Sequence, residues 1–194
     1  MYIWVGCKLP EDFERNTRAL CLEQNKALGL NTAAFSLPQH VSLKISFQSD
    51  RHEEILDYLE VFLSGQSPFS LRVHNAEQFG NILWLPVAEN ETLRQLHDQL
   101  DAELEQRFSI PQHEFDKCFL FHSTLFMDED TDKLSQMCQL LEKLPIEQNL
   151  QVDTFLLGLS ENNLPGEYRI VRQIQIYLQA VRQRTACFLF SVVL

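Results

Sequence analysis

The sequence predicts a mixed α/β (α+β) fold built from two similar halves. Strands and helices alternate along the chain, and the order strand, helix, strand, helix, strand occurs twice. The opening strands of the two halves begin at Tyr2 and Ile82, and their middle strands contain His40 and His122. The interval between the two opening strands is nearly equal to the interval between the two histidines. These matching offsets indicate an internal duplication with an approximate two-fold axis.

The first half is expected to hold three strands and two helices. Apolar or alternating stretches predict the strands, at residues 2–7, 40–47 and 69–74. Residues 11–29 have helical periodicity, and Gly29 suits a C-terminal cap. A second helix begins near Asp50 and buries an apolar stripe that includes Ile55 and Leu59.

The second half repeats this order and adds one closing strand. Strands are expected at residues 81–87, 118–127, 150–159 and 167–178, and helices at residues 91–108 and 130–144. We therefore predict one domain over residues 1–178. One lobe would span about 1–75 together with part of the C-terminal strands, and the other about 80–160. Residues 179–194 form a tail of unknown role.

Composition narrows the class of protein. The chain has 194 residues, of which 45% are hydrophobic and 22% charged, as in globular proteins. A net charge of -11 argues against binding to long nucleic acid, because a basic face supplies most of that affinity. The five cysteines are scattered without a C-x-x-C pair, and no apolar run could span a bilayer. We expect a cytoplasmic monomer without membrane contact.

The middle strand of each half carries a histidine and a hydroxyl residue two positions apart. These are His40 and Ser42 in "HVSL", and His122 and Thr124 in "HSTL". Residues two apart on a strand share a face, roughly 6.6 Å apart along the strand. Each strand would therefore present one group that moves a proton near neutral pH and one that donates a hydrogen bond.

Two such strands facing one groove would suit in-line displacement at phosphorus. One neutral imidazole would take a proton from the attacking oxygen, while the other, protonated, would give one to the leaving oxygen. The hydroxyls of Ser42 and Thr124 would donate to the non-bridging oxygens. This chemistry needs no metal or other cofactor, and we expect neither. We predict His40 and His122 as catalytic residues and the two hydroxyl residues as phosphate ligands.

The two tetrapeptides resemble the paired H-x-[S/T]-x signatures of the two-histidine (2H) phosphoesterases, which include 2′-5′ RNA ligase-like proteins and 2′,3′-cyclic nucleotide phosphodiesterases. The resemblance covers about Tyr2 to Leu178 and extends to "FGNILWLPV" and "GEYRIVRQIQIYL". Ser123 departs from it, because the residue between histidine and hydroxyl is usually apolar. The resemblance implies two lobes, each an antiparallel sheet with two helices on its outer face, and a cleft between them.

The resemblance also implies an activity. The chain would be a metal-independent phosphodiesterase acting on 2′,3′-cyclic phosphates or 2′-5′ linkages of RNA ends or small nucleotides. Weak ligase activity is left open, as is the assignment of base and acid. The alternative is a non-catalytic module that binds a nucleotide monophosphate in the same cleft. A third hypothesis is a metal site from His113, Cys118 and His122, although their spacing matches no known ligand pattern.

Lys44 and Phe126 have both a functional and a simpler interpretation, whereas His97 has only the simpler one. Lys44 continues the face of His40 and Ser42, so it is a candidate phosphate or RNA contact, or else a solvated lysine at a strand edge. Phe126 holds the matching position in the second half, where it would stack on a base or belong to the core. His97, between charged neighbours on a helix, is expected to be solvated.

Overall fold

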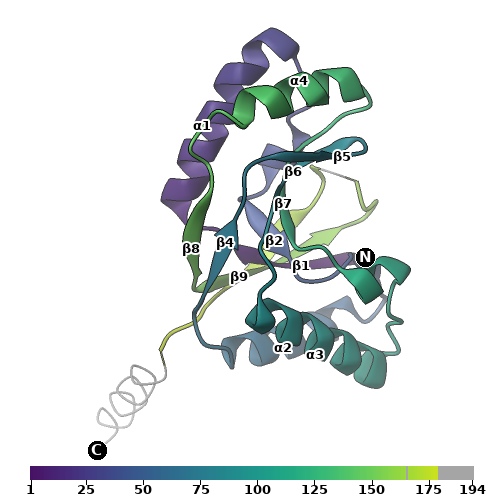
Figure 1. The fold of residues 1–194 in the computed structure, drawn as a ribbon. Helices are drawn as coiled ribbons and strands as arrows, with labels where there is room; N and C mark the ends of the chain where they lie inside the picture. Colours follow the sequence, from purple (N-terminus) through teal and green to yellow (C-terminus); the bar gives the residue numbers. More distant parts are fainter. Residues whose placement is uncertain (165, 179–194) are drawn as a thin grey trace, which may run out of the picture.

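Antiparallel sheets lie between two pairs of helices in this protein (Figure 1). The structure, a computed structural model, describes residues 1–164 and 166–178, so the predicted tail 179–194 lies outside the described residues. The strands are β1 Tyr2–Lys8, β2 His40–Ser42, β3 Phe47–Gln48, β4 Phe69–Val73, β5 Glu77–Phe79, β6 Ile82–Pro86, β7 His122–Met127, β8 Gln148–Val152, β9 Thr154–Ser160 and β10 Arg169–Gln175.

The sheet topology repeats between the halves. One sheet has the order β10-β9-β1-β2, with β3 also paired to β1, and another has the order β5-β6-β7. In each sheet the opening strand of a half, β1 or β6, pairs on one side with the histidine strand, β2 or β7. On its other side it pairs with the strand that follows β8 or β4. The three strands β9-β1-β2 therefore correspond to β5-β6-β7.

The remaining pair, β4 and β8, marks the approximate two-fold axis. These strands are antiparallel, and Leu71 at the centre of β4 lies opposite Leu150 at the centre of β8. The interval between the two leucines in the sequence is close to that between the opening strands. Each strand thus pairs with its own counterpart, as expected where a two-fold axis passes between two copies of one unit.

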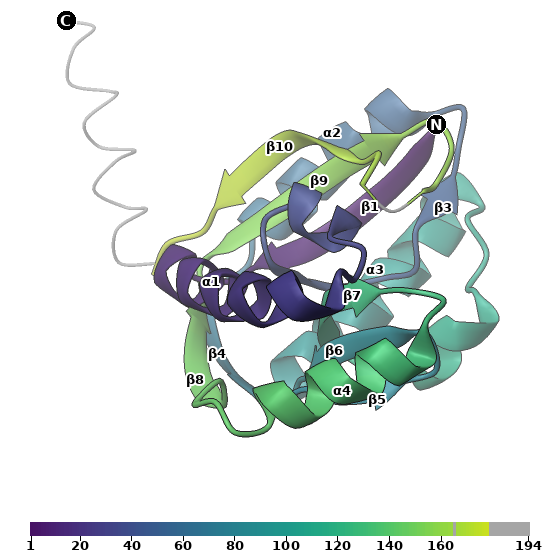
Figure 2. The same cartoon turned by 90° about the horizontal axis from the view of Figure 1, so that it is seen from above.

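The helices also follow this symmetry. They are α1 Glu11–Leu28, α2 His52–Ser64, α3 Glu91–Phe108 and α4 Thr131–Leu141. Helix α1 lies beside α4 (Figures 1 and 2). Helix α2 lies beside α3, where the Tyr58 hydroxyl donates to Glu103 at 2.7 Å. Each pair takes one helix from each half. In the described part of the chain, no helix is long and apolar enough to cross a membrane.

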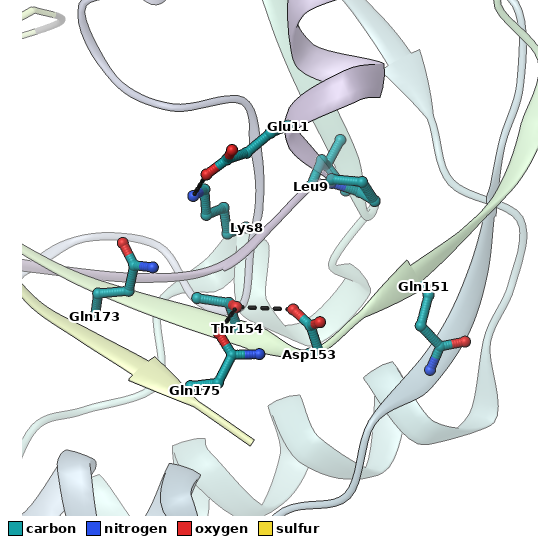
Figure 3. A pocket seen from close by; sticks show the side chains of 9 residues that line it. Lys8, Leu9, Glu11, Gln151, Asp153, Thr154, Gln173 and Gln175 are labelled. Carbon is teal, nitrogen blue, oxygen red and sulfur yellow. Dashed lines mark hydrogen bonds and ion pairs between the residues drawn. The ribbon is translucent and has the colours of Figure 1, made fainter. Parts of the chain in front are cut away.

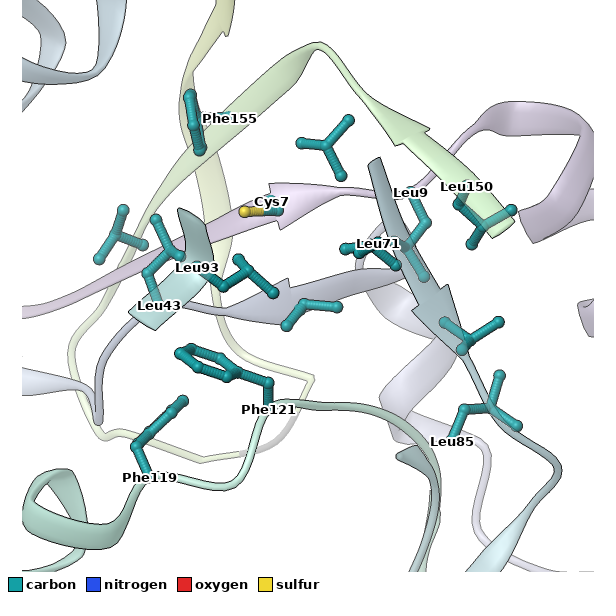
Figure 4. Close-up of a cluster of buried hydrophobic side chains, with 14 of the residues drawn as sticks. Cys7, Leu9, Leu43, Leu71, Leu85, Leu93, Phe119, Phe121, Leu150 and Phe155 are labelled. Carbon is teal, nitrogen blue, oxygen red and sulfur yellow. The ribbon is translucent and has the colours of Figure 1, made fainter. Parts of the chain in front are cut away.

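One apolar core joins the two halves. Figure 4 shows Leu43, which follows β2, in the same cluster as Phe119 and Phe121, which precede β7. Leu71 and Leu150 of the central strand pair belong to this cluster as well. Burial of these side chains, each worth roughly 1.5–3 kcal/mol, stabilises the position of β2 against β7.

Two expected strands are interrupted, and a short one was not expected. The strand predicted at residues 40–47 ends at Ser42, and the chain bends at Leu43 and Lys44 before β3. The strand predicted at 150–159 divides at Asp153, because β8 pairs with β4 while β9 pairs with β1 in a different sheet. Strand β5 is an addition to the predicted elements.

Candidate active site

Strands β2 and β7 lie side by side and bring the two motifs together (Figure 1). His40 and Thr124, one residue from each motif, line the same hollow of about 210 Å³. Two aromatic side chains, Trp4 and Tyr168, line it as well. Ala33 and Ala34 also line it.

Each histidine ring is fixed by a carbonyl group two residues before it. The distance from His40 Nδ1 to the Pro38 oxygen is 2.7 Å, and from His122 Nδ1 to the Leu120 oxygen it is 2.6 Å. A carbonyl oxygen only accepts, so Nδ1 carries the proton in both rings. Nε2 is then the nitrogen that gains or loses a proton, and the two halves orient their imidazoles in the same way.

Each histidine also packs against a tryptophan, which the motif alone did not reveal. The ring centres of Trp4 and His40 are 4.3 Å apart, and those of Trp84 and His122 are 4.2 Å apart. The tryptophans stand at the third position of the opening strand in each half, so they recur at the same interval as those strands. That shared offset is the sequence signal that could have identified them.

The hydroxyl residues differ between the halves. The indole Nε1–H of Trp4 donates to Ser42 Oγ at 2.9 Å, which leaves the hydroxyl proton free to donate elsewhere. Trp84 Nε1 is buried and has no hydrogen-bond partner among the described residues. Thr124 therefore lacks the indole contact that orients Ser42. Ser123 is buried, facing away from the hollow as its place between the two site residues requires.

Burial lowers the pKa of both histidines from the ordinary value of 6.5. For His40 desolvation lowers the pKa to about 4, partly opposed by the Pro38 carbonyl, and the positive charge of His122 lowers it further. Desolvation likewise lowers the pKa of His122, against an opposing effect of the Leu120 carbonyl. Both rings are thus mainly neutral at pH 7, and His40 is the more strongly held in that state.

Lys44 and Phe126 do not reach the hollow, so their predicted substrate contacts are wrong. Lys44 is only 2% exposed, and its ammonium group pairs with Asp101 and Asp116. It is neither a phosphate contact nor a solvated lysine, because the bend after Ser42 directs it inward. Phe126 is fully buried and packs edge-on against Phe35, with ring centres 5.3 Å apart. Its role in the core is the simpler of the two interpretations above.

His97 is also placed differently from the prediction. It is fully buried rather than solvated, and it lies close to Asp101 and Asp116. These three residues form the potential metal-ligand group within the described ranges 1–164 and 166–178. That group does not contain the trio His113, Cys118 and His122, and His122 Nδ1 is already engaged by a carbonyl.

A second, polar hollow lies elsewhere on the molecule (Figure 3). It is lined by Lys8, Asp153, Thr154 and Gln175 among others. Thr154 Oγ1 is 2.8 Å from Asp153 Oδ1 and 2.9 Å from Gln175 Oε1, so these groups are paired with one another. The hollow contains neither motif, and the candidate site is the one between β2 and β7.

Solved structures share this fold. TT0787 of Thermus thermophilus is 21% identical, with a TM-score of 0.56 over 90% of this chain and 97% of that chain. LigT of E. coli, complexed with 3′-AMP, is 17% identical, with a TM-score of 0.55 over 91% and 98%. Usb1 of Kluyveromyces marxianus is 11% identical, with a TM-score of 0.52 over 90% and 97%. The fold and the paired histidine motifs are those of a two-histidine phosphoesterase.

A family model completes the assignment. The model of the 2′-5′ RNA ligase superfamily matches residues 17–163, which include both histidine motifs. The chain therefore belongs to the 2′-5′ RNA ligase superfamily, as the resemblance of the motifs predicted. Its members are phosphoesterases that act on phosphodiesters of RNA or nucleotides. No curated protein matches the chain.

Proposed function

We propose that this protein is a metal-independent phosphodiesterase that opens 2′,3′-cyclic phosphates, or cleaves 2′-5′ linkages, at RNA ends or in small nucleotides. The observation that carries the proposal is the convergence of His40 and Thr124, from different motifs, on one hollow. Its modest size suits a nucleotide or the end of a short RNA. A solved structure of the related LigT contains 3′-AMP, which supports a small nucleotide as ligand.

His40 is proposed as the general base. Its pKa of about 4 keeps Nε2 unprotonated at neutral pH, so this nitrogen can accept a proton from the attacking water. The water oxygen forms a bond to phosphorus, and the bond from phosphorus to one ribose oxygen breaks. Nδ1 stays bonded to the Pro38 carbonyl, which stabilises the imidazolium that results.

His122 is proposed as the general acid. A phosphate anion between the rings would favour protonation of His122, because an opposite charge stabilises the cationic form. Nε2 then gives its proton to the departing ribose oxygen, and a phosphomonoester is produced. Proton exchange with water returns both rings to their starting states. Because the site is approximately symmetric, a substrate bound in the reverse direction would exchange the two roles.

Ser42 and Thr124 are proposed as phosphate ligands. The Ser42 hydroxyl accepts from Trp4, so its own proton is available for a non-bridging phosphate oxygen. Thr124 lines the hollow and would donate to the phosphate from the opposite strand. These two donors would stabilise the charge that develops on the non-bridging oxygens in the transition state.

A substrate panel with histidine variants tests the proposal. Wild-type protein is incubated with 2′,3′-cyclic mononucleotides and 2′-5′-linked oligonucleotides, with and without a chelator, and the product isomer is identified. His40→Ala and His122→Ala should each reduce kcat by at least about a hundredfold, the usual contribution of an acid or base. Chelator should have no effect. In the wild type, kcat/KM should fall as pH drops through about 4, where His40 becomes protonated.

The same panel separates catalysis from simple binding. Calorimetry with nucleotide monophosphates is run on the wild type and on both alanine variants. Tight binding without any product would favour a non-catalytic nucleotide-binding module. Turnover that survives both substitutions in a folded protein would exclude the proposed mechanism.

A further inference from the structure

A buried charged cluster lies behind the site and is made of Lys44, His97, Asp101 and Asp116. Their exposed fractions are 2%, 0%, 6% and 2%. The ammonium group of Lys44 pairs with the Asp101 carboxylate and lies 2.6 Å from Asp116 Oδ2. Lys44 stands two residues after Ser42 in the first half, whereas the other three residues belong to the second half. The cluster thus joins the two motif strands across the duplicated unit.

Both ring nitrogens of His97 lie close to backbone carbonyl oxygens. Its Nδ1 lies 2.6 Å from the Leu43 carbonyl oxygen, and its Nε2 lies 3.0 Å from the Asp116 carbonyl oxygen. These two contacts hold the ring between the segment that follows β2 and the segment that precedes β7.

The same contacts argue against a metal ion at this place. Ligand atoms of His97, Asp101 and Asp116 lie within 4.8 Å of one another. The Lys44 ammonium already bridges the two carboxylates, and it supplies the positive charge that a cation would bring. Each ring nitrogen of His97 already contacts a backbone carbonyl, so binding to a metal would break one of these contacts.

The cluster connects physically to the His122 ring. The His97 ring stacks on Phe119 with centres 4.8 Å apart, and it meets Phe121 edge-on at 5.9 Å. Leu120, the residue between these two phenylalanines, provides the carbonyl that accepts from His122 Nδ1. The orientation of that carbonyl therefore depends on the packing of Phe119 and Phe121 against His97.

Asp116 fixes the approach to the same segment. Its Oδ1 accepts from the Ile45 N–H at 3.1 Å, and its Oδ2 accepts from the His113 N–H at 3.0 Å and from Lys44. One carboxylate thus contacts the chain that leaves β2 and the turn that leads to β7. Substitution of Lys44 would leave this carboxylate without its ammonium partner, and substitution of His97 would remove the contact with the Asp116 carbonyl, so either change should weaken the anchor shared by both strands.

We propose that Lys44 and His97, through the charged cluster, are positioning residues that set the orientation of His122 and its distance from His40. This inference rests on the proposed function, because it assigns the cluster a part in the reaction of that site. Neither residue touches the substrate. A displacement of about 1 Å at a catalytic group can reduce the rate by about a hundredfold, so an anchor behind the site affects kcat.

His97→Phe is the first test. The phenyl ring keeps the packing against Phe119 and Phe121 but removes the polar contacts with the Leu43 and Asp116 carbonyls. We expect kcat to fall by between about ten- and a hundredfold while KM changes little, because the substrate contacts remain. The pH–rate profile should also shift, since the His122 ring would lose its fixed orientation. A folded variant with wild-type kcat and pH profile would overturn the inference.

A charge-balanced variant tests the cluster if His97→Phe does not fold. Lys44→Met with Asp101→Asn removes one charge of each sign from the cluster. The expected result is again a lower kcat with little change in KM. The matched control is Arg172→Met, because Arg172 also bridges two carboxylates, Asp57 and Glu60, but lies outside the hollow. Its kcat should equal that of the wild type.

Nitrogen NMR of the histidine rings separates this inference from the proposed function. In the wild type, His122 should show one protonated ring nitrogen, Nδ1, when neutral. Either positioning variant should change the His122 signals, whether or not any substrate is turned over. A wild type without turnover would reject the proposed function alone. Unchanged His122 signals in both folded variants would reject the positioning role alone.

Discussion

Lys44 and Phe126 occupy equivalent places in the two halves, but they hold their strands against the opposite half by different interactions. Each stands two residues after the motif hydroxyl, and each contacts the short 3-10 helix that precedes the histidine strand of the other half. Lys44 contacts Asp116 in the 3-10 helix Glu114–Cys118, and Phe126 contacts Phe35 in the 3-10 helix Ala33–Ser36. We call each of these contacts a junction: the junction at Lys44 is ionic, and the equivalent junction at Phe126 is aromatic.

This difference shows what the duplicated fold requires. In the proposed mechanism each histidine strand must be held against the opposite half, because the two rings would act together only at a fixed separation. An apolar contact such as that of Phe126 tolerates substitution better, because a slightly smaller apolar side chain still buries most of the same apolar surface. A buried ion cluster depends on every member, because the loss of one leaves an uncompensated charge. The ionic junction should therefore respond more strongly to substitution.

The largest effect on stability is expected for Lys44→Met. The substitution leaves Asp101 and Asp116 without their ammonium partner, and a broken buried ion pair costs about 3–5 kcal/mol. Urea denaturation at pH 7 measures the free energy of unfolding. Adding Asp101→Asn should recover most of the loss, because it restores the balance of charge. A loss under about 1 kcal/mol for Lys44→Met would show that the cluster contributes little to stability.

A smaller effect is expected for Phe126→Leu. The leucine keeps an apolar contact with Phe35 and leaves no unpaired charge, so the cost of the smaller side chain should stay below the value of about 3–5 kcal/mol expected for Lys44→Met. The cost should be the same at pH 5 and pH 8, because no titratable group is removed. The measurement is again urea denaturation, at both pH values. A cost equal to that of Lys44→Met would remove the distinction between the two junctions.

The contrast between these residues also shows how far the sequence could predict the structure. The alternating pattern predicted the order of strands and helices and the place of both motifs, because it depends on local periodicity. The pattern gave the wrong position for the Lys44 side chain, because the strand ends at Ser42 and the partners of the ammonium group lie 57 and 72 residues away in the sequence. Periodicity in a short stretch contains no information about such distant partners.

The prediction of a solvated His97 was wrong for the same reason. The two tryptophans were missed for a different one. Charged neighbours on the α3 sequence suggested a solvated His97, but its two carbonyl partners come from other segments of the chain. Trp4 and Trp84 look like ordinary core residues in a strand. Only their common offset, the same as that of the opening strands, relates them to the histidines.

The two tryptophans allow a matched pair of substitutions. Trp4→Phe removes the indole N–H that donates to Ser42, and the loss of such a bond costs about 1 kcal/mol of stability. Trp84→Phe removes a buried donor that has no partner among the described residues, so it should cost less or even stabilise the protein. Steady-state kinetics and thermal melting of both variants test this. Equal losses would contradict the asymmetry.

The smallest expected effect is a shift in the pKa of His40 when His122 is replaced by glutamine. Burial is the main cause that lowers the His40 pKa to about 4, and the charge of His122 is a smaller one. Removing that charge in His122→Gln should raise the pKa, because protonated His40 is then no longer repelled. The value should stay below 6.5, since Trp4 and the strands still exclude water. An NMR titration of the His40 ring measures it. A pKa that returns to 6.5 would mean that charge, rather than burial, keeps His40 neutral.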